Sequence, residues 1–379
     1  MAETILQLSA SDFDEAIAHL SLVFGDPNFS ELLPALYQPT DEHMRCNYAI
    51  RRDGTIVAIV GLFPISWVVG GERLKLAGVG GVSVHPSFRG HGYMRRLMDV
   101  VMDEIRRGGY HAACLGGNRR RYAYWGFEKA GIEASFLVTP NSLRHVGAQG
   151  AMHRESAALQ PDQIAVGDLC QMRGLYEQQI IRCDRSAARF PQHLSHWRRS
   201  VRVTRNAHGE VIAYGCVDPK DFSCMDLCGA DASAIESFLR ESVLTTDCAM
   251  RVSMPMLHTS QFARLAAISD DVSLIEASNW RIYDWAAVLG ALMRAKHSVQ
   301  PMAPGKCVLQ VAGCEESLRL EVDIGARCTR VSQQPDLVSE AGELLRMLAG
   351  PLPLTPRGGS QDWLRWRPLP LMIPMQDRI

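Results

Sequence analysis

Apolar positions in residues 1–140 recur at spacings that switch between those of helices and those of strands. Ser11 is a candidate helix cap, and the acidic residues that follow it suit a first helical turn. The apolar residues of this segment recur at helical spacing, which predicts a helix that buries Phe13, Ile17, Leu20 and Val23. Asp53-Gly54 and Gly70-Gly71 interrupt apolar runs and predict two hairpins. We expect strands at 47–52, 55–62, 65–69, 72–76, 79–84, 111–116 and 132–138, and helices at 93–107 and 119–125. This order predicts an α+β fold with a mixed sheet and helices packed against it.

The rest of the chain divides into a linker, a second unit and a third. Residues 141–158 are polar and poor in large apolar side chains, which predicts a linker. The second unit is again mixed, with helices expected at 167–179 and 232–244 and strands at 201–205, 210–216 and 249–253. The third has strands expected at 307–311, 317–322 and 327–330 and a helix at 337–348. The tail, 363–379, is so rich in Trp, Leu, Met and Pro that we expect it to pack on the protein.

Size and charge limit the classes of protein to consider. A chain of 379 residues is expected to form two or three domains. A net charge of −1 disfavours nucleic acid and anionic membranes as partners. No signal peptide and no apolar run long enough to span a membrane are predicted, so we expect a cytoplasmic protein. The eleven cysteines form no paired CxxC motif, so we expect most of them to be small buried thiols, and we expect no metal.

The segment 79–127 carries the candidate chemistry. Gly90 and Gly92 permit unusual backbone angles and close approach of a ligand, and the helix that begins at Tyr93 offers free N–H groups to an anion such as a pyrophosphate. Judged alone, this sequence is equally consistent with a plain turn. Val82 and Val84 would keep free backbone groups if the sheet splays there, although a buried strand stopped by Pro86 explains the residues as well.

Tyr122 is a candidate general acid, because a phenol is protonated near neutral pH. Core packing is the alternative role for this ring, and Tyr124 and Trp125 beside it suit an aromatic wall. Other side chains suggest chemistry but have plainer explanations. Cys114 could be a buried small residue, and His85 and His91 could be loop residues. The basic run Arg119–Arg121 could be a solvated face or a phosphate contact, and the acids Asp26, Glu31 and Glu42 could be solvated or could attract a cationic amine.

The stretch VSVHPSFRGHGYMRRLM, followed by Asn118 and by YAYWGFEKAG, resembles the acetyl-CoA-binding core of the GNAT superfamily of N-acetyltransferases. The superfamily's motif is Arg or Gln, two residues, Gly, one residue, then Gly or Ala. Arg89 and Gly92 match it, whereas Met94 departs from it. The Eis-like (enhanced intracellular survival) branch tolerates larger aliphatic residues there, and the layout of the chain is similar to that branch. The resemblance implies a GNAT domain at 1–145, a degenerate GNAT-like domain at 159–295 and a sterol-carrier-like α/β domain with the tail at 300–379.

The resemblance also implies an activity and a site. Acetyl-CoA would be the donor and a primary amine the acceptor, for example a polyamine, an aminoglycoside-like compound or a lysine. Tyr122 would be the general acid, and the terminal carboxylate of Ile379 would help to deprotonate the amine. The chain is expected to form a homo-oligomer, because relatives form rings. The implied cofactor-binding residues are Val82, Ser83 and Val84 for the pantetheine, Arg89, Gly90, His91, Gly92, Tyr93 and Met94 for the pyrophosphate, and Asn118 near the cofactor.

Two other functions remain open. A non-catalytic module that binds CoA or a lipid and acts as a sensor is the main alternative, because Met94 departs from the motif and the second domain is degenerate. An acetyltransferase directed at RNA or ribosomal proteins is disfavoured by the near-zero net charge.

Overall fold

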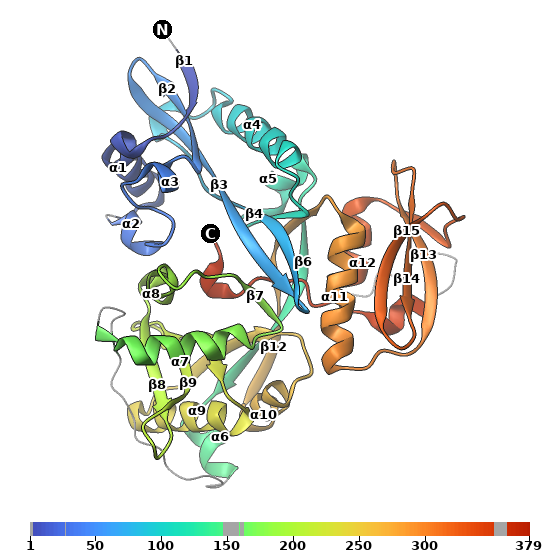
Figure 1. Cartoon of the computed structure of the whole chain (residues 1–379). Helices are drawn as coiled ribbons and strands as arrows, with labels where there is room; N and C mark the ends of the chain where they lie inside the picture. The colour runs from blue at the N-terminus through green and yellow to red at the C-terminus, as the bar shows by residue number, and fades with distance from the viewer. Residues whose placement is uncertain (1–2, 27, 147–158, 160–162, 352–361) are drawn as a thin grey trace.

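The computed structural model describes residues 3–26, 28–146, 159, 163–351 and 362–379. Its strands form two sheets, a large mixed one and a four-stranded one near the C-terminus (Figure 1). The large sheet has the order β1-β2-β3-β4-β5-β12-β6-β11-β10-β9-β8, and β7 pairs with β3 beside this path. The predicted α+β class with a mixed sheet is therefore confirmed.

The elements predicted for the N-terminal part occur in the predicted order, together with a first strand and short helices that were not predicted. Its strands are β1 (Glu3–Gln7), β2 (Asn47–Arg52), β3 (Thr55–Val69), β4 (Glu72–Val84), β5 (Ala112–Leu115) and β6 (Glu128–Val138). Its α-helices are α1 (Phe13–Phe24), α2 (Phe29–Leu32), α3 (Asp41–Met44), α4 (Tyr93–Arg107), α5 (Arg119–Tyr122) and α6 (Pro140–His145). Short 3-10 turns are η1 (Ala10–Asp12), η2 (Pro86–Phe88) and η3 (Ala123–Trp125).

Two boundaries in this part differ from prediction. The runs expected to be four short strands form two long ones, β3 and β4. Strand β3 continues through Pro64 because that residue lies between the stretch paired with β2, which ends at Gly61, and the stretch paired with β7, which begins at Trp67. A missing N–H is tolerated where a strand edge has no partner. Of the predicted linker, 141–145 belong to α6, and 147–158 lie outside the described residues.

The middle of the chain adds the second half of the large sheet. Its strands are β7 (Ile181–Cys183), β8 (Ser200–Arg205), β9 (Val211–Val217), β10 (Cys224–Gly229), β11 (Met250–Pro255) and β12 (Asp271–Ile282). Its helices are α7 (Val166–Glu177), α8 (Phe190–Leu194), η5 (His196–Arg198), α9 (Ala232–Thr246), α10 (Ser260–Ile268) and α11 (Trp285–Val299). Strand β12 lies between β5 and β6 and pairs with both. One sheet therefore runs through both predicted units, whose boundaries remain a prediction.

The C-terminal part has its own sheet and a tail that returns to the large one. Strands β13 (Gly305–Val311), β14 (Ser317–Val322), β15 (Ala326–Val331) and β16 (Leu337–Ser339) are ordered β15-β14-β13-β16. The helix predicted at 337–348 is instead β16 followed by α12 (Ala341–Ala349), because Leu337–Ser339 pair with β13. Turns η6 (Asp362–Trp366) and η7 (Met375–Asp377) lie in the tail, where Leu369, Leu371, Met372 and Ile373 are buried, as predicted.

Across the described ranges, no helix is both long and apolar enough to cross a membrane.

Candidate functional site

Strands β4 and β5 separate at the point where the candidate site begins. They pair in parallel from Leu76 with Ala112 to Val79 with Leu115, where β5 ends. Strand β4 continues to Val84, where β3 is its only partner strand among the described residues, and this pairing shifts register near Gly81, which has φ +59°. A bulge of this kind bends a strand and disrupts its ladder. The β5-facing backbone groups from Gly80 to Val84 are therefore available to a ligand.

The loop after β4 leads directly into an uncapped helix. Gly90 and Gly92 have φ of +83° and +76°, which explains why glycine is needed at both positions. Gly92 is the N-cap of α4, and no side chain caps this end. The Arg96 N–H donates to Gly92 O at 3.1 Å, so the N–H groups of the first turn before Arg96 remain for an anion.

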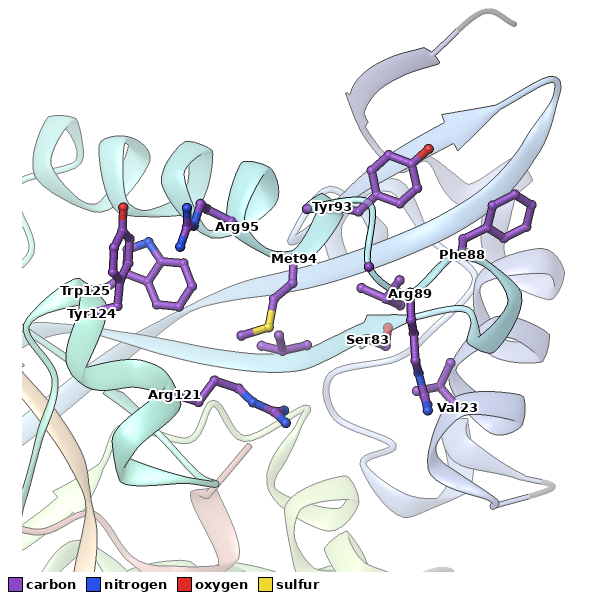
Figure 2. A pocket seen from close by; sticks show the side chains of 14 residues that line it. Val23, Ser83, Phe88, Arg89, Tyr93, Met94, Arg95, Arg121, Tyr124 and Trp125 are labelled. Atoms are coloured by element: carbon purple, nitrogen blue, oxygen red, sulfur yellow. The ribbon is translucent and has the colours of Figure 1, made fainter.

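These elements line a cleft of about 710 Å³. Figure 2 shows the start of α4 above the cleft, strand β4 below it, and the α5–η3 turn on one side. Arg89, Arg95 and Arg121 line it, and none of the three is ion-paired with another residue that the structure describes. Three unpaired cations beside free helix N–H groups make a site for a ligand with several phosphates. The lining residues are Val23, Val82, Ser83, Val84, Phe88, Arg89, Gly90, Gly92, Tyr93, Met94, Arg95, Arg121, Tyr124 and Trp125.

Tyr122 and Asn118 lie next to this cleft but not on its wall. The Tyr122 ring is buried in the core beneath it, and burial raises the pKa of its phenol, so the group stays protonated. A Cβ built on Gly117, just after β5, would lie 3.2 Å from the ring. Asn118 accepts the Arg120 N–H at 3.0 Å and thereby caps α5. His91 bonds the backbone oxygens of Phe88 and Arg89 and shapes the loop.

The C-terminus lies on β4, beside the separated strands. The Ile379 side chain occupies the space above Gly78 and Gly80: a Cβ on either glycine would come within 2.1 Å and 2.0 Å of it, respectively. A Cβ on Gly116, after β5, would lie 3.9 Å from a carboxylate oxygen of Ile379. The structure therefore brings the terminal carboxylate to the opening between β4 and β5. The contact is at Gly80, which precedes Val82 by two residues on β4.

A second cavity, of about 330 Å³, meets the site at Ile379. Strand β3, the loop after α2 and the segment around α8 enclose it, and sequence reasoning identified only Glu42 and Ile379 among its residues. The sequence carried no signal for the other residues that line this cavity, because they come together from distant parts of the chain. The lining residues are Ala35, Leu36, Glu42, Phe63, Pro64, Ile65, Ser66, Cys183, Asp184, Arg185, Ser186, Arg189, His193, His196, Asp377 and Ile379.

Other candidate side chains have structural partners. Asp26 is paired with Arg198 at 2.7 Å, and Glu42 is paired with Arg189 at the rim of the second cavity. Burial raises the pKa of the Cys114 thiol to about 12, which fits a buried small residue and not a nucleophile. Among the residues that the structure describes, no cluster of three or more His, Cys, Asp or Glu is placed to hold a metal ion.

Comparison with known proteins identifies the class of the N-terminal part. Residues 4–130 match the family model described as the acetyltransferase (GNAT) domain. This match covers about a third of the chain and includes β4, the glycine loop, α4 and Tyr122. The match shows an acyltransferase enzyme. No curated protein matches the chain.

Solved structures of similar fold extend over the whole chain. A protein from Enterococcus faecalis V583, described as a probable N-acyltransferase, has 11% identity and a TM-score of 0.69, with complete coverage of both chains. A GCN5-related N-acetyltransferase from Kribbella flavida has 15% identity and a TM-score of 0.68, covering 100% of this chain and 98% of that one. Eis1 from Mycobacterium abscessus has 16% identity and a TM-score of 0.58, covering 91% and 88%. At these identities the likeness shows the fold alone.

Proposed function

We propose that the chain transfers the acetyl group of acetyl-CoA directly to a primary amine. The observation that carries the proposal is that Val82–Val84 of β4 line one cavity, whereas a second cavity is lined by Ile379, which packs on Gly78 and Gly80 of the same strand. The arginine-lined cleft suits a phosphate-rich donor, whereas the second cavity has the terminal residue in its wall. A donor held in the first cavity and an amine held in the second would meet between β4 and β5.

The residues have distinct roles in this mechanism. Backbone groups of Val82, Ser83 and Val84 hold the pantetheine arm, and an N–H of this strand polarises the thioester carbonyl. The Ile379 carboxylate removes a proton from the amine, directly or through water, so that the nitrogen attacks the acetyl carbon. As the carbon–sulfur bond breaks, Tyr122 donates a proton to the departing thiolate. Burial favours the protonated phenol that this step needs.

The remaining residues proposed for the cofactor follow the loop. Gly90, His91 and Gly92 set its path, and Arg89 supplies a cation to the pyrophosphate. Met94 lines the cleft without blocking it, and Tyr93 packs beneath the helix start. Asn118 acts indirectly, since it caps the short helix that carries Arg121 and Tyr122.

For the C-terminal part we propose a sterol-carrier-like α/β domain that supports the other two units. Its four-stranded sheet and α12 are consistent with such a domain. A homo-oligomer is likewise proposed on the resemblance to the Eis-like branch.

The function is tested with the purified full chain, acetyl-CoA and a panel of amines: spermidine, an aminoglycoside and a lysine peptide. Release of the CoA thiol together with acetylated amine in the mass spectrum is the expected result. Acetyl-CoA should also protect the chain against heat. Protection without transfer to any amine would instead favour the non-catalytic sensor.

A further inference from the structure

The last turn of the chain, η7, buries two polar side chains, each of which has several polar contacts. Gln376 is fully buried, and its side-chain nitrogen contacts the backbone oxygens of His193, Leu194 and His196 at 2.8, 3.1 and 3.0 Å. Its own backbone oxygen lies 2.9 Å from His196 Nδ1. Such directional contacts fix both the position and the rotation of the turn.

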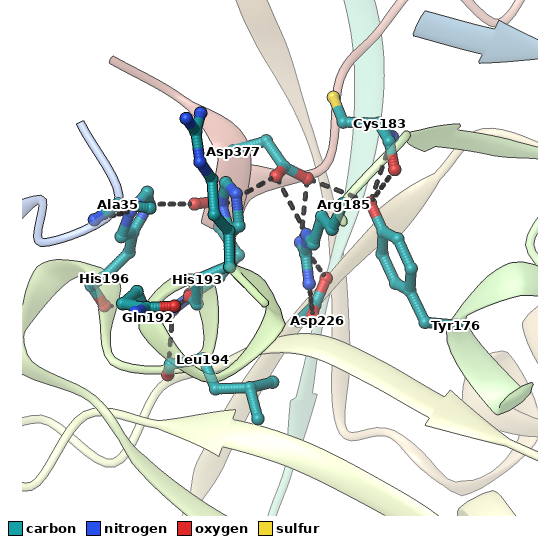
Figure 3. Close-up of polar contacts among 12 residues, drawn as sticks. Ala35, Tyr176, Cys183, Arg185, Gln192, His193, Leu194, His196, Asp226 and Asp377 are labelled. Atoms are coloured by element: carbon teal, nitrogen blue, oxygen red, sulfur yellow. Dashed lines mark hydrogen bonds and ion pairs between the residues drawn. The ribbon is translucent and has the colours of Figure 1, made fainter. Parts of the chain in front are cut away.

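Asp377 is held even more specifically. Its Oδ1 accepts Arg185 Nε–H at 2.9 Å and its Oδ2 accepts Arg185 Nη2–H at 2.8 Å, a bidentate pair (Figure 3). The Tyr176 hydroxyl donates to Oδ2 at 3.1 Å. The side chains of Asp377 and Arg185 are only 3% and 1% exposed. A bidentate pair combines geometric specificity with strength, so this contact has one preferred arrangement.

Arg185 is itself fixed by other residues. Its remaining guanidinium N–H groups donate to Asp226 at 2.6 and 3.0 Å, and its charge lies 3.9 Å from the centre of the Tyr176 ring. Every partner of Gln376 and Asp377 named here belongs to residues 176–226, which we call the docking segment. This segment lies outside the residues that match the GNAT family model.

Two residues beyond Asp377 the chain reaches the candidate active site. Arg378 pairs with Glu133, a buried residue of β6, and Ile379 lies on Gly78 and Gly80 of β4. Figure 1 shows the C-terminus between β3 and β4 on one side and α8 on the other. The anchor is thus provided by the docking segment, whereas the group that it places belongs to the proposed active site.

We propose that the docking segment is a clamp for the chain's own C-terminus, and that Arg185 and Asp377 are positioning residues that place the Ile379 carboxylate against the acceptor amine. This inference rests on the proposed function. The clamp would give the second unit a role in the reaction, although the residues that line the proposed donor cleft all belong to the N-terminal part. The clamp acts on the base and leaves the arginine-lined cleft unchanged, so its loss should lower kcat and leave the KM for acetyl-CoA unaltered.

The test compares three variants of the full chain: Asp377→Asn, a chain that lacks Ile379, and both changes together. We expect Asp377→Asn to lower kcat at least tenfold with the KM for acetyl-CoA changed less than twofold. If Asp377 acts through the terminal carboxylate, the combined variant should be no slower than the chain that lacks Ile379. Asp168→Asn is the matched control, because it also removes one carboxylate from a bidentate pair with an arginine, Arg205, and this pair does not involve the tail; its kcat should stay within threefold of the parent value.

Different results separate the two proposals. Absence of transfer by the parent chain, or full activity without Ile379, contradicts the proposed function. Activity that depends on Ile379 but not on Asp377, or effects that multiply in the combined variant, overturns the clamp. If Asp377→Asn does not fold, Asp377→Glu keeps the charge and lengthens the side chain by one methylene; a parental kcat in that folded variant would also overturn the clamp.

Discussion

Ile379 packs directly on the α-carbon of Gly80, where any side chain would displace it. A Cβ on Gly80 would lie 2.0 Å from Cγ2 of Ile379 and 3.4 Å from its carboxyl carbon. Gly80 does not have a left-handed backbone angle, so its requirement is one of space and not of φ. The missing side chain at Gly80 therefore leaves the space that lets Ile379 lie against β4 beside the separated strands.

We predict that Gly80→Ala lowers kcat at least tenfold, because a displacement of about 1 Å at a reacting group can cost 10²-fold. Steady-state kinetics and a thermal melt check this, and the KM for acetyl-CoA should change little. Gly174→Ala is the control: Gly174 lies in α7, has no atom within 4 Å of an added Cβ and has no positive φ. Parental kcat in folded Gly80→Ala would mean that the position of Ile379 does not matter.

The arginines of the cleft should govern donor binding. Arg89→Ala and Arg121→Ala are each predicted to weaken acetyl-CoA about tenfold, since charge-assisted hydrogen bonds contribute roughly 1.5–3 kcal/mol. Titration calorimetry at two salt concentrations measures this, and the salt dependence should shrink in each variant. Arg106→Ala at the far end of α4 is the control, because Arg106 is exposed and pairs with Asp103. Equal effects at Arg106 and Arg89 would rule out a specific phosphate site.

The sequence predicted the loop and the helix beside the arginine-lined cleft, because their signals are local; their role in binding a donor stays a prediction. Gly90 and Gly92 do adopt positive φ, and α4 begins at Tyr93 and ends at Arg107 as the apolar spacing indicated. Within about 25 residues, strand, turn and helix each leave a signal in composition or period. The separation of β4 from β5 also follows from local features, the bulge at Gly81 and the short length of β5.

The surroundings of Ile379, which we propose as the acceptor side, could not be predicted, because their contacts join distant residues. Arg185 and Asp377 are 192 positions apart, and nothing in either neighbourhood marks them as partners. Likewise, the insertion of β12 between β5 and β6 depends on pairing across more than a hundred residues, which an apolar pattern does not specify. The terminal carboxylate of Ile379 was expected in the site only through resemblance to a family, whereas the clamp and the glycines that receive it emerged from the fold.

Tyr122 provides the third prediction. Replacing it by Phe removes the only proton that this ring can give and should lower kcat by about 10²-fold. Because the ring is buried and keeps its packing in the Phe variant, the melting temperature and the KM for acetyl-CoA should stay close to the parent values. Tyr124→Phe is a matched control: Tyr124 lines the cleft, is 64% exposed and lies two residues away. A Tyr122→Phe variant as fast as the parent would remove Tyr122 from the acid role.

His196 provides the fourth prediction, a loss of stability in mild acid. Its Nε2 accepts the Ala35 N–H at 3.3 Å while its Nδ1 faces Gln376 O at 2.9 Å, an arrangement that requires the neutral ring with the proton on Nδ1. Burial lowers the pKa of His196 to about 4 in the folded chain, against 6.5 when unfolded. Between these values the unfolded chain binds a proton that the folded chain refuses, so stability falls as pH falls, by about 1.4 kcal/mol per pH unit.

Chemical denaturation at pH 7.0 and pH 5.0 measures this effect, with the difference in unfolding free energy compared between the parent and His196→Gln. The glutamine cannot gain a proton, so its loss of stability between the two pH values should be smaller by about 2 kcal/mol. His208→Gln, at an exposed position in the β8–β9 turn, should keep the parental pH dependence. Because His196 joins Ala35 to the last turn of the chain, its protonation in the folded chain near pH 4 should also release the C-terminus and lower kcat. An identical pH dependence in His196→Gln and the parent would show that this ring does not couple stability to acid.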